Sequence, residues 1–364
     1  MKISRSTTLL LKKIDMVRRS IRIIRQLLLV KISRKPRPVF MYLHLTNRCN
    51  LRCSYCYANV NDRFDNPNVK DLKTDEWKKL IDDSYLLGAR YFHLYGGEPL
   101  IRNDIDELVD HCLDKGLFVE VLTNGHFVKN KIETLKKIQS VCISLDGDKK
   151  SNDRVRGDGN FEAVEKAVKV CAANGIRVRL HSTLNSFNSS SPSFLPSLAQ
   201  QWNTTISYSV PHVPDHADQE TVNIPDKAVR HFLASILRLK RNGMPIDNTY
   251  ASLKYTIQWP FSINTLFSTK NDYIDSLKGT KHKLSPCVFG KCAVVVDSEG
   301  YVIKCINLHM NAGLKFQDLG FANAYAHGLV KHNCFACSYP QFAETSNAIN
   351  LSLKSILKGA KHHL

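Results

Sequence analysis

Three cysteines on one short stretch are the residues whose types and spacing point most directly to chemistry. Cys49, Cys53 and Cys56 follow one another as Cys-x3-Cys-x2-Cys. Thiolates this close along a chain can converge on one metal centre. A structural zinc ion or a plain electron-transfer cluster normally takes four protein ligands, so three leave one metal position open for a reacting molecule. The stretch therefore predicts a reactive metal centre, with a partial zinc site or coincidental thiols as the simpler alternatives.

A second group of four cysteines predicts a closed metal site. Its members are Cys287, Cys305, Cys334 and Cys337. A hairpin with strands at 293–296 and 301–303 is predicted between the first two. By spacing alone, four thiolates fit a structural zinc ribbon and an iron–sulfur cluster equally well. Cys292 is surplus, and three roles are open for it: a buried strand residue, an alternative ligand, or a thiol that faces the substrate.

Alternating strands and helices must position these groups. Strands are predicted at 39–45, 91–95, 118–122, 140–145, 176–183 and 205–210, and helices at 73–87, 105–115, 130–137, 160–174 and 226–241. Parallel strands need crossover helices, so six such units predict an incomplete parallel barrel of the α/β class. The first cysteine loop follows the first strand, at the end of the barrel where α/β folds place their chemistry.

The first cysteine motif, with Tyr55 just before its last cysteine, resembles the signature of the radical SAM enzymes. The resemblance implies a (β/α)6 barrel and a [4Fe–4S] cluster held by the three thiolates, with S-adenosylmethionine (SAM) bound to the fourth iron. One electron then cleaves SAM to methionine and a 5′-deoxyadenosyl radical, which takes a hydrogen atom from the substrate.

Further motifs of that family follow in order. Gly96-Gly97-Glu98-Pro99, directly after a predicted strand, resembles the segment that holds the SAM amino group. By the same resemblance, Ser144 and Asp146 contact the SAM ribose or carboxylate, and Asn185 occupies a polar position on the fifth strand that contacts SAM. For Arg156, a carboxylate-binding role and an ion pair on the barrel rim are both open.

The second cysteine group resembles a twitch domain, the shortened form of the SPASM domain that follows many radical SAM barrels. Gly300 stands five residues before Cys305, as in that domain, and a Cys-x2-Cys pair follows. The resemblance implies one auxiliary [4Fe–4S] cluster on the four cysteines. A cluster with four protein ligands has no open iron, so its expected role is to move an electron, for example away from a substrate radical.

Composition limits the alternatives. The chain has 364 residues, 43% of them hydrophobic, which is ordinary for a globular protein. Its eleven cysteines are clustered and no cleavable signal peptide is evident, which favours metal sites in the reducing cytoplasm over disulfides. The formal net charge of +18 is concentrated in residues 1–37, which hold twelve Lys or Arg and one acid. Basic charge on a leader is weak support for nucleic-acid binding, and no specific nucleic acid is expected.

The basic leader predicts one amphipathic helix at 8–32. Leu10, Ile14, Val17, Ile21, Ile24 and Leu28 recur at steps of four and three and form an apolar stripe. Its charges exclude a transmembrane helix. Two roles are open: peripheral contact with an anionic membrane surface, or packing on the protein's own body or on a partner.

Together these features predict a leader at 1–37, a radical SAM barrel at 38–245 and a twitch-like domain at 246–364 that ends in a helix at 350–358. The expected function is hydrogen abstraction from a peptide or small molecule, with oxidation through the auxiliary cluster. Redox-neutral or carbon–carbon coupling chemistry on a lipid-linked substrate is the alternative, and a metal-binding interaction protein is the non-enzyme alternative. The enzyme would need a low-potential electron donor such as flavodoxin or ferredoxin.

Overall fold

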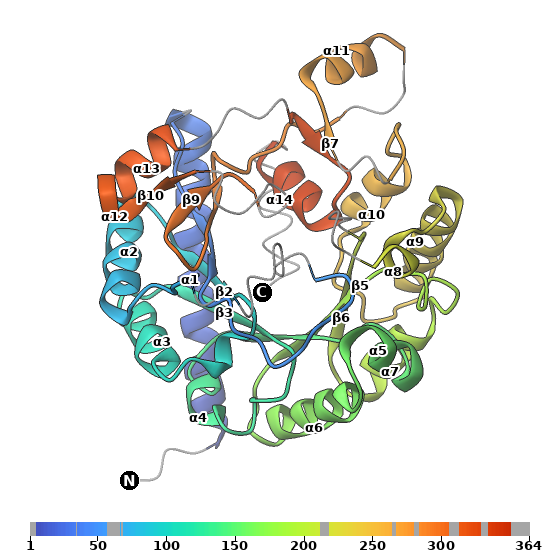
Figure 1. The fold of residues 1–364 in the computed structure, drawn as a ribbon, viewed down its shortest axis with the longest axis horizontal. Helices are drawn as coiled ribbons and strands as arrows, with labels where there is room; N and C mark the ends of the chain where they lie inside the picture. Colours follow the sequence, from blue (N-terminus) through green and yellow to red (C-terminus); the bar gives the residue numbers. More distant parts are fainter. Residues whose placement is uncertain are drawn as a thin grey trace.

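The computed structural model describes residues 5–33, 35–56, 66, 68–211, 218–263, 267–279, 284–305, 313–328 and 334–350. Six parallel strands form the centre, and helices surround them (Figure 1). The strands are β1 (Phe40–His44), β2 (Tyr91–Tyr95), β3 (Phe118–Thr123), β4 (Ser140–Ser144), β5 (Val178–Thr183) and β6 (Thr205–Ser209). Each pairs in parallel with the next, so the predicted α/β class and the order of the six strands are confirmed.

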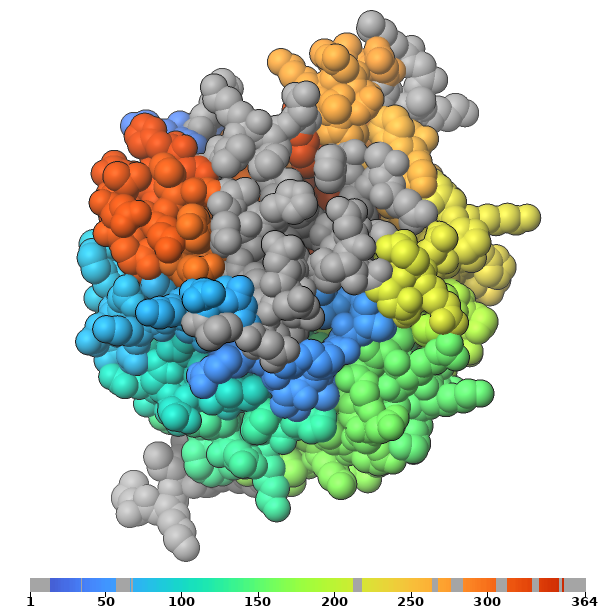
Figure 2. Space-filling model, in the orientation of Figure 1, coloured from blue at the N-terminus to red at the C-terminus, as the bar shows by residue number. Residues whose placement is uncertain are grey.

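Helices follow the strands along the chain, and most of them cover the outside of this sheet. They are α2 (Thr74–Leu86), α3 (Ile105–Asp114), α4 (Ile132–Leu135), α5 (Lys149–Arg156), α6 (Asn160–Ala173), α7 (Phe194–Gln201), α8 (Gln219–Val222) and α9 (Asp226–Arg241). In Figure 2 the segments follow one another round the molecule from blue through green to yellow. Helix α2 shows why such helices form and dock: Glu76 accepts a hydrogen bond from the Lys73 N–H at 2.8 Å, and Trp77 and Leu80 are fully buried.

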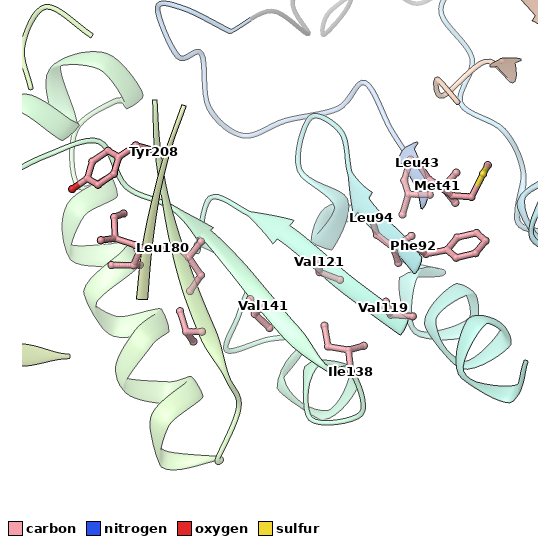
Figure 3. Close-up of a cluster of buried hydrophobic side chains, with 14 of the residues drawn as sticks. Met41, Leu43, Phe92, Leu94, Val119, Val121, Ile138, Val141, Leu180 and Tyr208 are labelled. Atoms are coloured by element: carbon pink, nitrogen blue, oxygen red, sulfur yellow. The ribbon is translucent and has the colours of Figure 1, made fainter. Parts of the chain in front are cut away.

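Side chains alternate between the two faces of the strands. Phe92, Leu94, Val119 and Val121 point to the helices and belong to the main hydrophobic core (Figure 3). The residues between them point into the barrel, because successive strand residues face opposite sides. Many of these inward residues are polar, so the barrel interior is not a simple hydrophobic core.

The C-terminal part continues the sheet of the barrel. Strand β8 (Ala293–Val296) pairs in parallel with β1, and β9 (Tyr301–Ile303) pairs antiparallel with β8, which confirms the predicted hairpin. Strand β10 (Leu314–Lys315) follows at the edge and leads into α12 (Phe316–Leu319) and α13 (Phe321–His327). The hairpin is thus an extension of the barrel sheet beyond its first strand.

The opposite edge of the sheet is covered by the last described helix. Helix α14 (Pro340–Asn350) contacts α10 (Tyr250–Ile257) and β6. Near it, β7 (Phe267–Ser268) pairs with β11 (Ala336–Cys337), and α11 (Lys270–Gly279) follows β7. The chain after β6 therefore packs against both edges of the open barrel. The helix predicted at 350–358 lies outside the described residues except for Asn350.

Helix α1 (Arg5–Ser33) confirms the predicted leader helix, and it packs on the body by a row that differs from the predicted stripe. Ile23, Leu27 and Val30 pack in a cluster with Val39, Val288, Cys292 and Ile349. Arg19 and Arg22 donate hydrogen bonds to the carbonyl oxygens of Leu117 and Gly116. The buried row is offset from the predicted stripe by one residue, and each residue turns an α-helix by about 100°. The predicted stripe therefore lies about 100° round the helix from the buried row. Three members of the stripe, Ile14, Val17 and Ile21, are exposed.

Helix α5 was not predicted. Its sequence, KKSNDRVR, has a single apolar residue and therefore no hydrophobic period to detect. A capping residue holds it instead: the Asp148 carboxylate accepts a hydrogen bond from the Ser151 N–H at 2.8 Å, and Gly157, at φ +112°, ends the helix. This short helix carries Arg156 into the site described below.

Candidate active site

One cavity of about 310 Å³ lies among the cysteine loop, the inward faces of the barrel strands and the C-terminal segment. The predicted site residues that line it are Cys49, Cys53, Tyr55, Cys56, Gly96, Gly97 and Ser144. Glu98, Asp146 and Asn185 lie behind its wall and are at most 1% exposed. The structure thus brings the predicted residues to one place, in two layers.

The three thiols of the first motif open onto this cavity. Burial raises the pKa of Cys49 to about 11, and burial likewise raises the pKa of Cys53, against the opposing charge of Arg156. The Cys49 sulfur accepts a hydrogen bond from the Leu51 N–H at 3.4 Å, and the Asn124 amide lies 3.9 Å away. Half-buried thiols with such donors suit thiolate ligands once a positive centre is bound. The donor set therefore fits the three-cysteine [4Fe–4S] cluster.

No group of three or more His, Cys, Asp or Glu side chains among the described residues is arranged to hold a single metal ion. A cuboidal cluster makes a different demand, because each thiolate binds a separate iron. Three sulfurs that face one cavity without meeting at a point are compatible with that demand.

Arg156 links the cysteine loop to the barrel through a buried network. Its Nε donates to Asp146 Oδ2 at 2.7 Å, and its Nη2 donates to the Tyr55 hydroxyl at 2.6 Å. Tyr55 in turn bonds the same Asp146 oxygen, and the Thr183 N–H donates to the other oxygen at 2.8 Å. Of the two roles open for Arg156, the structure therefore has the ion pair, in a buried position.

The two glycines before Glu98 are required by packing against the cysteine loop. A Cβ atom on Gly97 would lie 2.2 Å from the Arg48 carbonyl oxygen, and one on Gly96 would lie 2.7 Å from that of Thr46. The Gly97 and Glu98 N–H groups donate to those same two carbonyls, at 2.7 and 2.8 Å. The glycine motif thus fixes the cysteine loop, whose position in turn fixes the thiols.

Glu98 is fully buried beneath these glycines. Its carboxylate accepts hydrogen bonds from the Leu100 N–H at 3.0 Å, the Thr123 hydroxyl at 2.9 Å and the Asn124 N–H at 2.8 Å. Burial raises the pKa of Glu98 to about 7, although these donors oppose the rise. Asn124 also donates to the Asn50 side chain at 2.8 Å. Glu98 therefore joins the end of β3 to the cysteine loop.

Replacing Glu98 by Gln should change how stability depends on pH. The carboxyl has a pKa of about 7 in the folded protein, against an ordinary value of 4.5. A pKa raised by folding gives stability that is present below the unfolded value and lost as the pH rises through the folded value. The wild type should therefore lose about 3 kcal/mol relative to E98Q between about pH 4 and pH 8. Urea unfolding of the cluster-free proteins measures this, with E133Q as the exposed control, and a flat difference would contradict the raised pKa.

Ser144, Asp146 and Asn185 occupy different environments at the strand ends. Ser144 lines the cavity, whereas the Asp146 carboxylate is taken up by the Arg156 network. The Asn185 side chain accepts from the Phe187 N–H at 3.0 Å and donates to the Thr183 carbonyl at 3.1 Å. In this structure the last two residues shape the loops around the cavity, and only Ser144 faces it.

The four C-terminal cysteines gather on the far side of an aromatic wall. Cys287, Cys305 and Cys337 pack in one cluster with Phe289 and Phe342. Burial raises the pKa of Cys334 to about 11, and the neighbouring Cys287 adds to that rise. Phe289 and Phe342 also line the cavity. The second cysteine group therefore lies one layer of side chains behind the first site.

Cys292 lies apart from that group. It is fully buried and packs with Val30, Val39 and Val288 beneath helix α1. Of the three roles left open by the sequence, this environment matches the buried strand residue.

Several ionisable residues inside the barrel were not found from the sequence. His93, Glu120, Arg179 and His181 lie on β2, β3 and β5 and line the same cavity. The signal was available, because each interrupts an otherwise apolar strand pattern at an inward position. The role of Asn124 was also not predicted, because its sequence neighbourhood is typical of a turn.

With this geometry established, comparison with known proteins gives the class. Residues 43–188 match the Radical SAM superfamily. These residues are thus a radical SAM region, and members of that superfamily are enzymes that use a [4Fe–4S] cluster and SAM.

Individual relatives resemble the chain over different lengths. The Fe-coproporphyrin III synthase of Methanosarcina barkeri is 36% identical over 165 residues, which are 44% of this chain and 40% of the synthase. The mycofactocin maturase MftC of Mycobacterium tuberculosis is 26% identical over 307 residues, 79% of this chain and 70% of the maturase. The match thus spans well under half of the synthase.

Two solved structures share the fold. Streptococcus suis SuiB bound to S-adenosylmethionine aligns with a TM-score of 0.59 and 16% identity, over 76% of this chain and 62% of SuiB. Native anSMEcpe with bound AdoMet and the Cp18Cys peptide aligns with a TM-score of 0.60 and 14% identity, over 90% of this chain and 100% of that one. At such low identities the likeness shows a shared fold and nothing more. No helix of the described residues is both long enough and apolar enough to span a bilayer.

Proposed function

We propose that this enzyme cleaves SAM reductively at a cluster held by Cys49, Cys53 and Cys56 and removes a hydrogen atom from a peptide bound in the cavity. The observation that carries the proposal is the common cavity of these thiols, the glycine motif and Ser144. The bound cluster and SAM supply the radical chemistry. The chain's own part is to hold the loop through Gly97 and Arg156 and to enclose the reacting groups. Glu98 supports this loop from below and lies in the segment expected to meet the SAM amino group.

A peptide is the proposed substrate because several of the similar proteins are named for a peptide or were solved with one bound. One is a maturase, another is the PqqA peptide cyclase of Methylocella silvestris, and two solved structures of the same fold hold peptides. The proposal extends that substrate class to this chain.

We further propose one auxiliary [4Fe–4S] cluster on Cys287, Cys305, Cys334 and Cys337, through which an electron leaves the substrate radical. The aromatic wall supports this role, since Phe289 and Phe342 touch both the cysteine cluster and the cavity. A low-potential donor such as flavodoxin or ferredoxin would supply the electron for SAM cleavage.

The test is anaerobic reduction of the reconstituted enzyme with dithionite in the presence of SAM. We expect 5′-deoxyadenosine to form and one of two clusters to respond spectroscopically to added SAM. Failure to form 5′-deoxyadenosine with a full complement of iron would overturn the proposed activity. About four irons and one zinc per chain would leave that activity in place and make the C-terminal site structural.

We also propose that helix α1 attaches the enzyme to an anionic membrane surface. Its outer face exposes Ile14, Val17 and Ile21, at 39%, 38% and 58%, and the exposed Arg18 and Arg25 flank them. Apolar side chains beside basic ones suit the interface of an acidic bilayer. The inner face of the same helix is already packed on the barrel, so attachment need not unfold it.

Changing Ile14, Val17 and Ile21 together to Ser should weaken binding to vesicles that contain phosphatidylglycerol by about tenfold or more. Vesicle sedimentation measures the effect, and 5′-deoxyadenosine formation should be unchanged. A matched control changes Leu86 and Leu319, which are exposed elsewhere, to Ser. Equal binding of the wild type and both variants would contradict the proposal.

A further inference from the structure

The floor of the cavity carries a carboxylate with one oxygen in use and one available. Glu120 points inward from β3, and its side chain is only 5% exposed. Three groups donate to its Oε2: the Tyr91 hydroxyl at 3.0 Å, His93 Nδ1 at 2.9 Å and Arg179 Nη2 at 2.7 Å. Among the described residues nothing donates to Oε1. Because Glu120 lines the cavity, this oxygen is offered to whatever the cavity holds.

The Glu120 carboxylate is ionised, and the Arg179 guanidinium beside it also interacts with Asp247. Burial alone would raise the pKa of Glu120, but Arg179 and His93 outweigh it and hold that pKa well below the ordinary value. Arg179 also lies 3.7 Å from Asp247 and donates to the Ser207 hydroxyl at 2.9 Å. Two carboxylates thus share one guanidinium. Burial and the charge of Arg179 lower the pKa of His181 to about 3, so this neighbour brings no positive charge near neutral pH.

The walls around this floor are aromatic. Tyr42, Tyr95, Phe289, Tyr339 and Phe342 line the cavity. Tyr42 packs against both His93 and Phe289, with ring centroids 5.6 Å apart in each case. Aromatic faces attract cations, and a carboxylate oxygen that faces the cavity makes its strongest hydrogen bond with a charged donor. An anion here would meet Glu120, and an alkyl group would leave Oε1 without a hydrogen bond.

We propose that the cavity floor is a subsite for a protonated primary amine of the substrate, held by Glu120 Oε1 among the aromatic rings. A lysine side chain and the amino terminus of a peptide both carry such a group. A hydroxyl group can also donate to Oε1, but it gains little from the negative charge of Glu120 or from the rings. This inference rests on the proposed function, because the amine anchors the molecule from which hydrogen is removed.

Hydrogen transfer from small probes tests the subsite without knowledge of the natural substrate. The reconstituted enzyme is given SAM, dithionite and one perdeuterated probe: n-butylammonium, n-butanol or butyrate. Abstraction breaks a carbon–deuterium bond of the probe and forms one in 5′-deoxyadenosine, and dithionite reduces the carbon radical left behind. Mass spectrometry of 5′-deoxyadenosine then reports which probe lies in the cavity. We expect at least about tenfold more deuterium from butylammonium than from butyrate, because a charge-assisted hydrogen bond is made only with the former.

Variants locate the preference. Glu120→Gln should abolish the preference for the ammonium probe. If that variant does not fold, Glu120→Asp takes its place: it keeps the charge but moves the carboxylate away from the cavity, and it should reduce the preference. Glu133→Gln, with its side chain 78% exposed on α4, is the matched control and should behave as the wild type.

The outcomes separate the two proposals. Equal deuterium from all three probes, or an unchanged preference in a folded, cluster-loaded E120Q, would overturn the amine subsite and leave the proposed activity standing. No 5′-deoxyadenosine with any probe, despite full iron content, would overturn the proposed activity and the subsite with it.

Discussion

Changing Cys49, Cys53 and Cys56 together to Ala should leave about four iron atoms per chain in place of about eight and should abolish 5′-deoxyadenosine formation. The three thiols share one cavity. The other cysteine that lines it, Cys142 on β4, is only 1% exposed and burial raises its pKa, so it is poorly suited to replace them as a thiolate ligand. The C-terminal cysteines lie behind the aromatic wall and should keep the proposed auxiliary cluster. Iron analysis and EPR spectra of the anaerobically reconstituted protein make the measurement.

A matched control changes three cysteines that are buried in the core. Cys112 and Cys171 belong to the main hydrophobic core, and Cys292 packs beneath α1. Their joint replacement by Ala should lower stability by about 1 kcal/mol for each site but should leave about eight irons and full activity. Loss of iron from this control would contradict the proposed set of ligands, most directly the exclusion of Cys292. Near-zero iron in the first variant would contradict the auxiliary cluster.

Much of the fold follows from periodicities that act locally. Strand β2 was predicted at the observed bounds of Tyr91–Tyr95 and helix α9 at those of Asp226–Arg241, because their apolar residues recur at the period of the element. The hairpin of β8 and β9 was likewise predicted residue for residue. Its pairing with β1 was not, since nothing in either strand specifies a partner more than 200 residues away.

The site was predictable only where a residue type carries its own chemistry. Three cysteines at short spacing indicate a metal without any knowledge of the fold. Glu120 and Arg179 are 59 residues apart, and they become informative only when strand register places them together inside the barrel. The outward face of α1 shows the same limit: both of its apolar rows have a helical period, and only packing decides which one is buried.

The second large effect is expected at Arg156, where changing the residue to Met should lower the free energy of unfolding by about 3 kcal/mol or more. Asp146 is fully buried, and removal of the guanidinium would leave its carboxylate with the Thr183 N–H and the Tyr55 hydroxyl alone. A buried charge that loses its partner is costly, because the protein interior does not replace the lost solvation. Urea unfolding of the wild type and the variant measures the difference.

Arg154 supplies the control from the same helix. Arg154 pairs with Glu220 at a N–O distance of 2.7 Å, the same distance as between Arg156 and Asp146. The side chains of Arg154 and Glu220, however, are both more than half exposed. Changing Arg154 to Met should therefore cost no more than about 0.5 kcal/mol. If the two variants unfold at the same urea concentration, the network around Asp146 does not stabilise the barrel as described. If only R156M is destabilised, faster loss of iron to a chelator in that variant would show that the same network also holds the loop of Cys53, through Tyr55.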